Sequence, residues 1–143
     1  MEPMAEKPAI LFLCTGNSCR SQMAEGLCRA LRGEDYEVAS AGIETHGLNP
    51  NAVQVMAEIG IDISGHSSKT LDDLAGREFD YVITVCDSAR ETCPWFPAGT
   101  ALLHQGFDDP PVLAEKAASE EEVLDKYRRV RDEIRDYVQG LQL

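Results

Sequence analysis

The stretch AILFLCTGNSCRSQMAEGLCRALRG, residues 9–33, decides the fold of this chain. It opens with a short continuous apolar run, residues 9–13, which is typical of a strand buried on both faces. A loop that contains a glycine follows at residues 14–20. From Ser21 apolar residues recur at helical spacing as far as Gly33, which is placed to end the helix. The stretch therefore predicts a strand, a loop and a helix in succession.

Similar units follow along the rest of the chain. Strands are predicted at residues 36–41, 81–85 and 100–104, and the second of these is the clearest β-branched run. Helices are predicted from the Asn49 cap to Gly60, as a short turn around Leu71, and after a capping box of Ser119 and Glu122. Because strands alternate with helices, we expect an α/β fold with right-handed crossovers and a parallel sheet covered on both faces.

Composition limits the class of protein. With 143 residues, 43% of them hydrophobic, the chain is expected to form a single domain, residues 1–143. The 13 basic and 25 acidic residues give a net charge of −12, which argues against nucleic acid and anionic membrane surfaces as partners. No apolar run approaches the roughly 20 residues of a membrane helix, and residues 1–8 lack a signal-peptide core, so a cytoplasmic location is predicted. Five unevenly spaced cysteines predict reduced thiols in that compartment.

Several polar residues and thiols follow directly after predicted strands. Cys14, residues 40–42, Cys86 and residues 108–109 all hold such positions. Ligands of parallel sheets bind beyond the carboxyl ends of the strands. We therefore expect these four groups to converge on one edge of the sheet.

The loop at residues 14–20 has the composition of an oxyanion site. Cys14 and Arg20 are separated by five residues, enough for backbone N–H groups to surround a tetrahedral anion at the start of a helix. Gly16 is expected to permit the backbone turn, and Arg20 to close the site with a bidentate contact. The same field should lower the pKa of Cys14 and make it a nucleophile, with Ser21 donating its hydroxyl to the sulfur. The alternative is a buried apolar cysteine and a solvated arginine, which the position between strand and helix disfavours.

Three motifs resemble a known family. CTGNSCRSQMAEG, residues 14–26, resembles the nucleophile loop of the low-molecular-weight protein tyrosine phosphatase fold. SAGIETHGLNPNAV, residues 40–53, and GFDDP, residues 106–110, resemble its thioredoxin-coupled arsenate reductase branch. The similarity runs from about Ala9 to the last helix. It implies a four-stranded parallel sheet of order 2-1-3-4 flanked by helices, and an enzyme that reduces arsenate to arsenite.

Two further cysteines, Cys86 and Cys93, allow several interpretations. On a regular helix they would lie roughly 10.5 Å apart, beyond the roughly 7 Å that a disulfide permits between Cα atoms, so pairing requires the segment to unwind. They are otherwise a core cysteine with an exposed bystander, or zinc ligands, although their spacing does not suit zinc. A phosphatase needs neither thiol, whereas a reductase needs thiols as its source of electrons.

The resemblance implies a role for each of these thiols. Cys14 attacks arsenic, Cys86 then attacks the sulfur of Cys14, and Cys93 displaces Cys14 from that disulfide. Thioredoxin reduces the final disulfide, and no tightly bound cofactor or metal is implied. The oxyanion, arsenate or its analogue phosphate, is held by the residues of the loop, which are Thr15, Gly16, Asn17, Ser18, Cys19 and Arg20.

The resemblance also assigns the general acid. Asp109, directly before Pro110, matches it, and Asp108 beside it is expected to raise its pKa by like-charge repulsion. Without the resemblance, this sequence is more often a simple turn. The segment after Pro110 lacks the tyrosines typical of the tyrosine phosphatases, which weakens the phosphatase interpretation.

Some members of the family hold potassium beneath the loop, at positions that match Asn17, Glu25, Ser40 and an aspartate. Here Lys69 stands at the position of the aspartate, so we expect a lysine ammonium in place of the ion and no strong activation by potassium.

Two alternatives to the reductase stay open, a phosphomonoester or phosphotyrosine hydrolase and a redox-sensing oxyanion-binding module. The scattered histidines predict no site, and Cys28 is assigned to the core.

Overall fold

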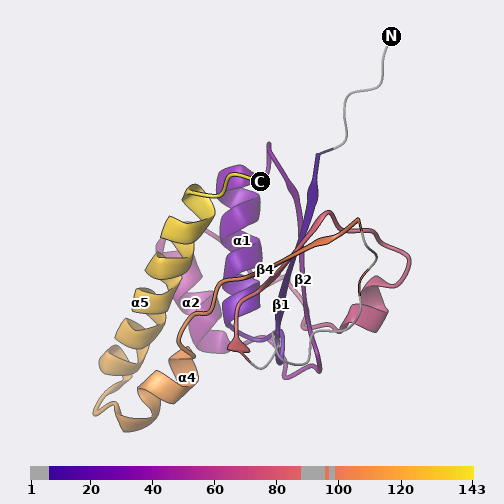
Figure 1. Cartoon of the computed structure of the whole chain (residues 1–143). Coiled ribbons are helices and arrows are strands. Elements are labelled where there is room, and N and C mark those ends of the chain that lie inside the picture. Colours follow the sequence, from indigo (N-terminus) through magenta and orange to yellow (C-terminus); the bar gives the residue numbers. More distant parts are fainter. Residues whose placement is uncertain (1–6, 88–95, 97–98) are drawn as a thin grey trace.

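The computed structural model describes residues 7–87, 96 and 99–143 (Figure 1). Its strands are β1 (Ala9–Cys14), β2 (Glu37–Gly42), β3 (Tyr81–Thr84) and β4 (Ala101–His104). Its α-helices are α1 (Arg20–Arg32), α2 (Pro50–Glu58), α4 (Pro110–Leu113) and α5 (Glu120–Gln139), and the 3₁₀ helices η1 and η2 span Leu71–Leu74 and Ala114–Lys116. Every predicted element is present within two residues of its expected bounds, whereas α4 and η2 were not predicted.

The four strands form one parallel sheet in the order β2-β1-β3-β4. The predicted order and direction are therefore confirmed. All six residues of β1 are buried, because this strand has a neighbour on each side and is covered on both faces. β4 lies at the edge of the sheet and leaves Leu102 exposed.

The helices are distributed unequally over the two faces of the sheet. Helices α1, α2 and α5 lie on one face, and η1 lies on the other (Figure 1). Helix α5 packs against α1 through apolar side chains repeated every three or four residues, among them Tyr127, Val130 and Ile134. Its polar face carries a network of ion pairs, in which Arg128 bridges to Glu58 of α2.

The two predicted helix caps have different outcomes. Asn49 caps α2 as predicted, because its Oδ1 accepts hydrogen bonds from the N–H groups of the first turn. At α5 the Ser119 hydroxyl accepts from Glu122 N, which confirms half of the predicted capping box. The other half is wrong. The Glu122 carboxylate accepts from the N–H of Ala118, one residue earlier than the box requires.

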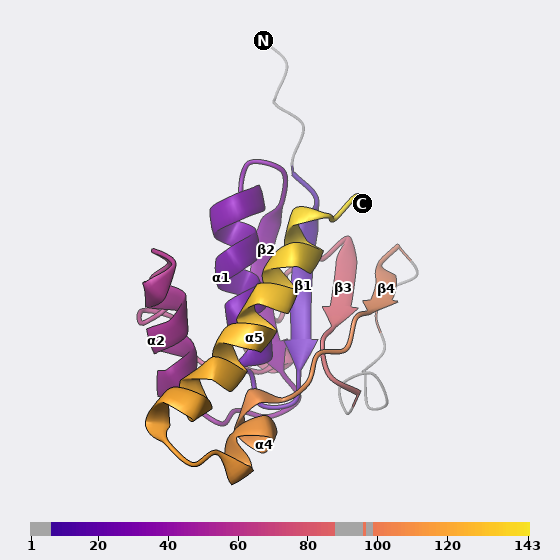
Figure 2. The same ribbon diagram turned by 90° about the vertical axis from the view of Figure 1, so that its left-hand side faces the viewer.

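The strands end at a common edge, since they are parallel, and the loops after them gather there together with α4 (Figure 2). The expected convergence of residues after the strands is therefore confirmed. No helix within residues 7–87 and 99–143 combines the length and the apolarity needed to cross a bilayer.

Candidate active site

The loop between β1 and α1 turns its carbonyl groups outward. Four carbonyl oxygens between Cys14 and Ser18 accept backbone hydrogen bonds of 2.9–3.1 Å from the segment that runs from Ile43 to Asn49. A peptide bond is planar and trans, so an outward carbonyl leaves the next N–H facing inward. The loop thereby presents N–H groups to its interior, which is the arrangement that binds an oxyanion.

The buried side chain of Asn17 stabilises this loop through hydrogen bonds. Asn17 is fully buried, and it is the residue of the loop in the left-handed conformation, with φ of 47°. Its Nδ2 donates to the hydroxyls of Ser21 and Ser40, each at 2.9 Å, and its Oδ1 accepts from the backbone N–H of Lys69 at 2.9 Å. One amide side chain thus ties the loop to α1, to β2 and to the chain before η1.

Gly16 serves a different purpose from the predicted one. It has no positive φ, so the backbone turn that the sequence assigned to it occurs at Asn17. Its missing side chain instead leaves room for the ring of His46, because a Cβ at Gly16 would lie 2.2 Å from His46 Nδ1. His46 in turn donates its backbone N–H to Gly16 O at 2.9 Å.

Gly42, at the end of β2, is confined even more tightly. A Cβ there would lie 2.3 Å from Glu44 O and 2.8 Å from both Asn17 N and Thr15 O. All three of these atoms belong to the backbone. Only a glycine lets the end of β2 approach the loop this closely.

Arg20 has a guanidinium group with an unused donor. Its Nη1 donates to Phe107 O at 3.0 Å, and its Nη2 lies 3.6 Å from Asp109 Oδ2. Its Nε is buried and has no hydrogen-bond partner among the described residues. A buried unpaired donor is costly, and an oxyanion above the loop would supply the missing acceptor.

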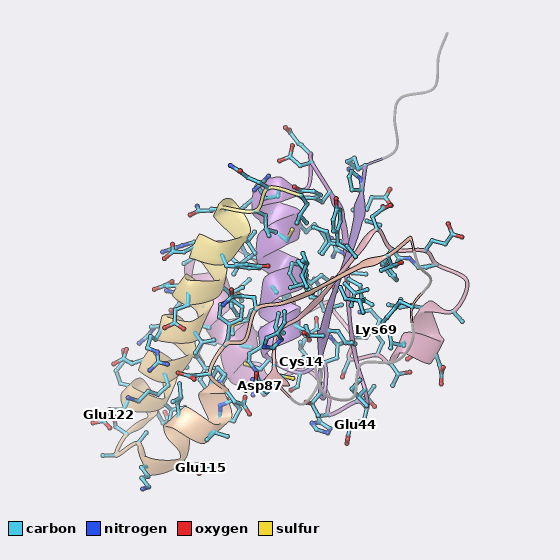
Figure 3. All side chains as sticks on the ribbon, in the orientation of Figure 1. Cys14, Glu44, Lys69, Asp87, Glu115 and Glu122 are labelled. Atoms are coloured by element: carbon cyan, nitrogen blue, oxygen red, sulfur yellow. The ribbon has the colours of Figure 1, made fainter. Side chains whose placement is uncertain are left out.

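These groups line an open cavity of about 370 Å³ at the carboxyl edge of the sheet. Its lining residues are Cys14, Thr15, Gly16, Ser18, Cys19, Arg20, His46, Asp109 and Pro111. Figure 3 shows Cys14, Glu44 and Asp87 toward this end of the molecule. The predicted nucleophile, the arginine and the aspartate therefore face one space, and so does His46, which the sequence did not assign to any site.

Cys86 brings a second thiol to the nucleophile. It is buried at the end of β3, and its Sγ shares a hydrogen bond of 3.2 Å with the Thr15 hydroxyl. Its thiol also hydrogen-bonds to Cys14, and this contact is the largest cause of a raised pKa at Cys14, followed by burial. Arg20 and the N–H of Thr15 act in the opposite direction. The predicted lowering of the Cys14 pKa is therefore wrong for this state, because the neighbouring thiol and burial outweigh the field of the loop.

Ser21 makes a different contact from the one expected, and Asp108 has a partner outside the site. The Ser21 hydroxyl accepts a hydrogen bond from Asn17, and no contact between Ser21 and the Cys14 sulfur occurs among the described hydrogen bonds. Its own hydrogen stays available for another acceptor. Asp108 pairs with Arg129 of α5.

Of the three remaining cysteines, the structure describes Cys19 and Cys28. Cys19 is buried at the start of α1, and burial raises the pKa of its thiol. Cys28 is fully buried in the core as predicted, and burial raises the pKa of its thiol to about 11. Cys93, the predicted third redox cysteine, lies outside the described residues.

Beneath the loop lies a buried carboxylate with two cationic neighbours, Arg29 and Lys69, and with His66, whose pKa is lowered by burial. Glu25 accepts a hydrogen bond of 2.6 Å from Ser40, and its oxygens lie 2.9 Å from Arg29, 3.7 Å from Lys69 and 3.6 Å from His66. The Lys69 ammonium thus lies beside the carboxylate, where the sequence placed it. In the described part of the chain, no three His, Cys, Asp or Glu side chains are arranged to hold a metal ion.

Comparison with known proteins adds independent information. Residues 9–142 match the family described as low molecular weight phosphotyrosine protein phosphatase. An arsenate reductase of Halalkalibacterium halodurans is 52% identical over 128 residues, which cover 90% of this chain and 90% of that protein. A solved arsenate reductase in the phosphate binding state has a TM-score of 0.73 at 29% identity, covering 93% of this chain and 95% of that one. A thioredoxin-dependent arsenate reductase of Corynebacterium glutamicum has a TM-score of 0.66 at 28% identity, covering 98% of this chain and 66% of that one.

Proposed function

This chain belongs to the low-molecular-weight phosphotyrosine protein phosphatase family, and we propose that within it the chain reduces arsenate to arsenite with electrons from its own thiols. One observation carries this proposal, the buried Cys86 thiol at the nucleophile loop, where its Sγ lies 3.2 Å from the Thr15 hydroxyl and its proximity raises the pKa of Cys14. A hydrolase uses one nucleophile and a water molecule. A reductase needs a second thiol against the first, because two electrons leave as a disulfide.

In the first step Cys14 attacks arsenic. The loop N–H groups and the free Nε of Arg20 hold the oxygens, and the bound arsenate dianion takes the proton of the Cys14 thiol. A sulfur–arsenic bond forms and an arsenic–oxygen bond breaks. Asp109, on the rim of the cavity, gives a proton to the departing oxygen, which leaves as water.

In the second step Cys86 releases the arsenic. Its thiol attacks the sulfur of Cys14 and its proton goes to an oxygen of the departing arsenite, so that a sulfur–sulfur bond forms and the sulfur–arsenic bond breaks. The electron pair of the broken bond goes to arsenic, which passes from oxidation state V to III. Two thiols and arsenic acid thus give one disulfide, arsenous acid and water.

In the third step the disulfide passes from Cys14 and Cys86 to Cys86 and Cys93. Cys93 attacks Cys86, which frees Cys14 as a thiol and leaves a disulfide between Cys86 and Cys93. Thioredoxin then supplies two electrons, in line with the thioredoxin-dependent relative from Corynebacterium glutamicum. Residues 1–143 form the single unit that does this, in a reducing compartment such as the cytoplasm.

The test follows thioredoxin oxidation after arsenate is added, alongside hydrolysis of an aryl phosphate. We expect turnover with arsenate that is lost in Cys86→Ser and Cys93→Ser, and an arsenic adduct on Cys14 of Cys86→Ser by intact mass under nondenaturing conditions. Fast hydrolysis of the aryl phosphate at a rate unchanged by both substitutions would instead support a phosphatase. Anion binding without either activity would support a redox-sensing module.

A further inference from the structure

A chain of three side chains lies beside Cys86 at the end of the sheet. His104, on β4, contacts the Thr84 hydroxyl of β3 through Nδ1 at 2.7 Å. Its other ring nitrogen, Nε2, lies 3.1 Å from Asp87 Oδ1. Thr84 and His104 are partners in the β3–β4 register, so the ring is fixed by the sheet itself.

These contacts lie at the point along the chain where the backbone hydrogen bonds of β3 end. Val85 is still bonded on both sides, its N–H donating to Leu13 O at 3.0 Å and its carbonyl accepting from Phe107 N at 3.1 Å. Cys86 is the next residue, and Asp87 follows it. Cys86 is therefore bracketed by the sheet on one side and by the contact between His104 and Asp87 on the other.

The contact suits either protonation state of His104. A neutral ring donates Nε2–H to Asp87 and accepts the Thr84 hydroxyl proton at Nδ1. A protonated ring donates from both nitrogens, and the Thr84 hydroxyl then turns to Leu103 O, 3.3 Å away. The tie to Asp87 persists in both cases.

Gly106 leaves the space that this contact occupies. A Cβ at Gly106 would lie 3.2 Å from His104 Nε2 and 3.5 Å from Asp87 Oδ1. Both atoms of the contact therefore lie against one backbone position. A larger residue at position 106 would press on the contact from the side.

We propose that His104 is a positioning residue for the second sulfur. By holding Asp87 it keeps Cys86 against Cys14 and Thr15, ready to attack the Cys14 sulfur. That attack forms the disulfide and returns the electron pair of the sulfur–arsenic bond to arsenic. This inference rests on the proposed function for its substrate, whereas the positioning of one thiol against the other is a property of the fold.

The test measures arsenite release in a single turnover without thioredoxin. Because Asp87 is largely exposed, we expect His104→Ala and Asp87→Ala to slow release about fivefold each, the upper range for such pairs. The double variant should be no slower than either single one. His104→Gln keeps an N–H at the reach of Nε2 and should stay within about twofold of the native rate.

One control separates positioning from general damage. Phosphate should protect Cys14 from alkylation equally in all variants, because the loop is untouched. His104→Ala at the native rate, or additive effects in the double variant, would overturn the proposal.

A readout without arsenate separates this inference from the proposed function. One equivalent of hydrogen peroxide converts Cys14 to a sulfenic acid, which Cys86 then resolves to the same disulfide. If the native chain releases no arsenite but forms this disulfide faster than His104→Ala, the proposed function fails and the positioning role stands. Equal rates of disulfide formation in the two proteins would overturn the positioning role.

Discussion

At the scale of single residues, the Cys14 thiol is governed by a neighbour 72 positions away in the sequence. The spacing of Cys14 and Arg20 correctly indicated a loop of inward-facing N–H groups, and it led to an expected lowering of the Cys14 pKa. The contact with Cys86 reverses that expectation in the reduced state. Strand order placed Cys86 at the same edge of the sheet, but the spacing of residues within the loop contains no information on its effect on the Cys14 pKa.

Removing Cys86 should therefore lower the pKa of Cys14. In Cys86→Ala the hydrogen bond that raises this pKa is gone, while Arg20 and the Thr15 N–H still favour the thiolate. The midpoint of Cys14 alkylation by iodoacetamide should shift to lower pH, measured by mass spectrometry across a pH series. Cys28→Ala, whose site is in the core, should leave the midpoint in place. An unchanged or higher midpoint in Cys86→Ala would contradict the assigned cause.

The two adjacent aspartates should differ sharply in their effect on the reaction. Asp109→Asn cannot give a proton to the departing oxygen, so arsenite release in a single turnover should fall about a hundredfold. Asp108→Asn removes an exposed ion pair with Arg129 and should change the rate less than about threefold. Similar losses in both variants would mean that Asp109 is not the acid.

At the scale of secondary-structure elements, the local rules served well where partners are near in sequence. The cap of α2 by Asn49 follows from Asn49-Pro50 alone, and the bounds of β1 follow from its apolar run. One hydrogen bond of the predicted capping box at Ser119 is wrong, because the Glu122 carboxylate accepts from the N–H of Ala118 in place of that of Ser119. Two N–H groups lie within reach of that carboxylate, and the sequence does not distinguish them.

The cap of α5 gives a prediction for stability. Ser119→Ala leaves the N–H of Glu122 without its acceptor and should lower the free energy of unfolding by about 1 kcal/mol. Urea unfolding followed by circular dichroism measures this change. Ser64→Ala, on an exposed loop, is the matched control and should cost less. A loss at Ser119 no larger than at Ser64 would show that the cap contributes little.

At the scale of the whole molecule, the loop and the charges beneath it form one connected unit. The sequence indicated which residues gather at the sheet edge, because strand order and the resemblance to a family fix that placement. It did not indicate that His46 packs on Gly16, since this contact depends on how the segment after β2 folds over the loop. Nor did it indicate that Arg20 keeps a buried donor unused.

That unused donor predicts stabilisation by phosphate. An anion that binds only the folded chain adds about 2.7 kcal/mol at one hundred times its dissociation constant, or roughly 5–10 °C in melting temperature for a chain of this size. Calorimetry with and without phosphate measures the shift. Arg20→Ala should abolish most of it, and an equal shift in that variant would place the anion elsewhere.

The Lys69 ammonium predicts indifference to potassium. It lies 3.7 Å from Glu25, so a cationic group already neighbours the buried carboxylate. Steady-state reduction of arsenate should proceed at equal rates in potassium and sodium chloride of the same ionic strength. Clear stimulation of the native chain by potassium over sodium would contradict this assignment.

The crowding around Gly42 has a consequence for laboratory evolution of this chain. Every substitution there would drive a carbon atom into three main-chain atoms that have no rotamer to change. A saturation library at that codon should return glycine alone among its active clones. The codon can therefore serve as a built-in gauge of selection stringency, since any other residue among the survivors would reveal background growth.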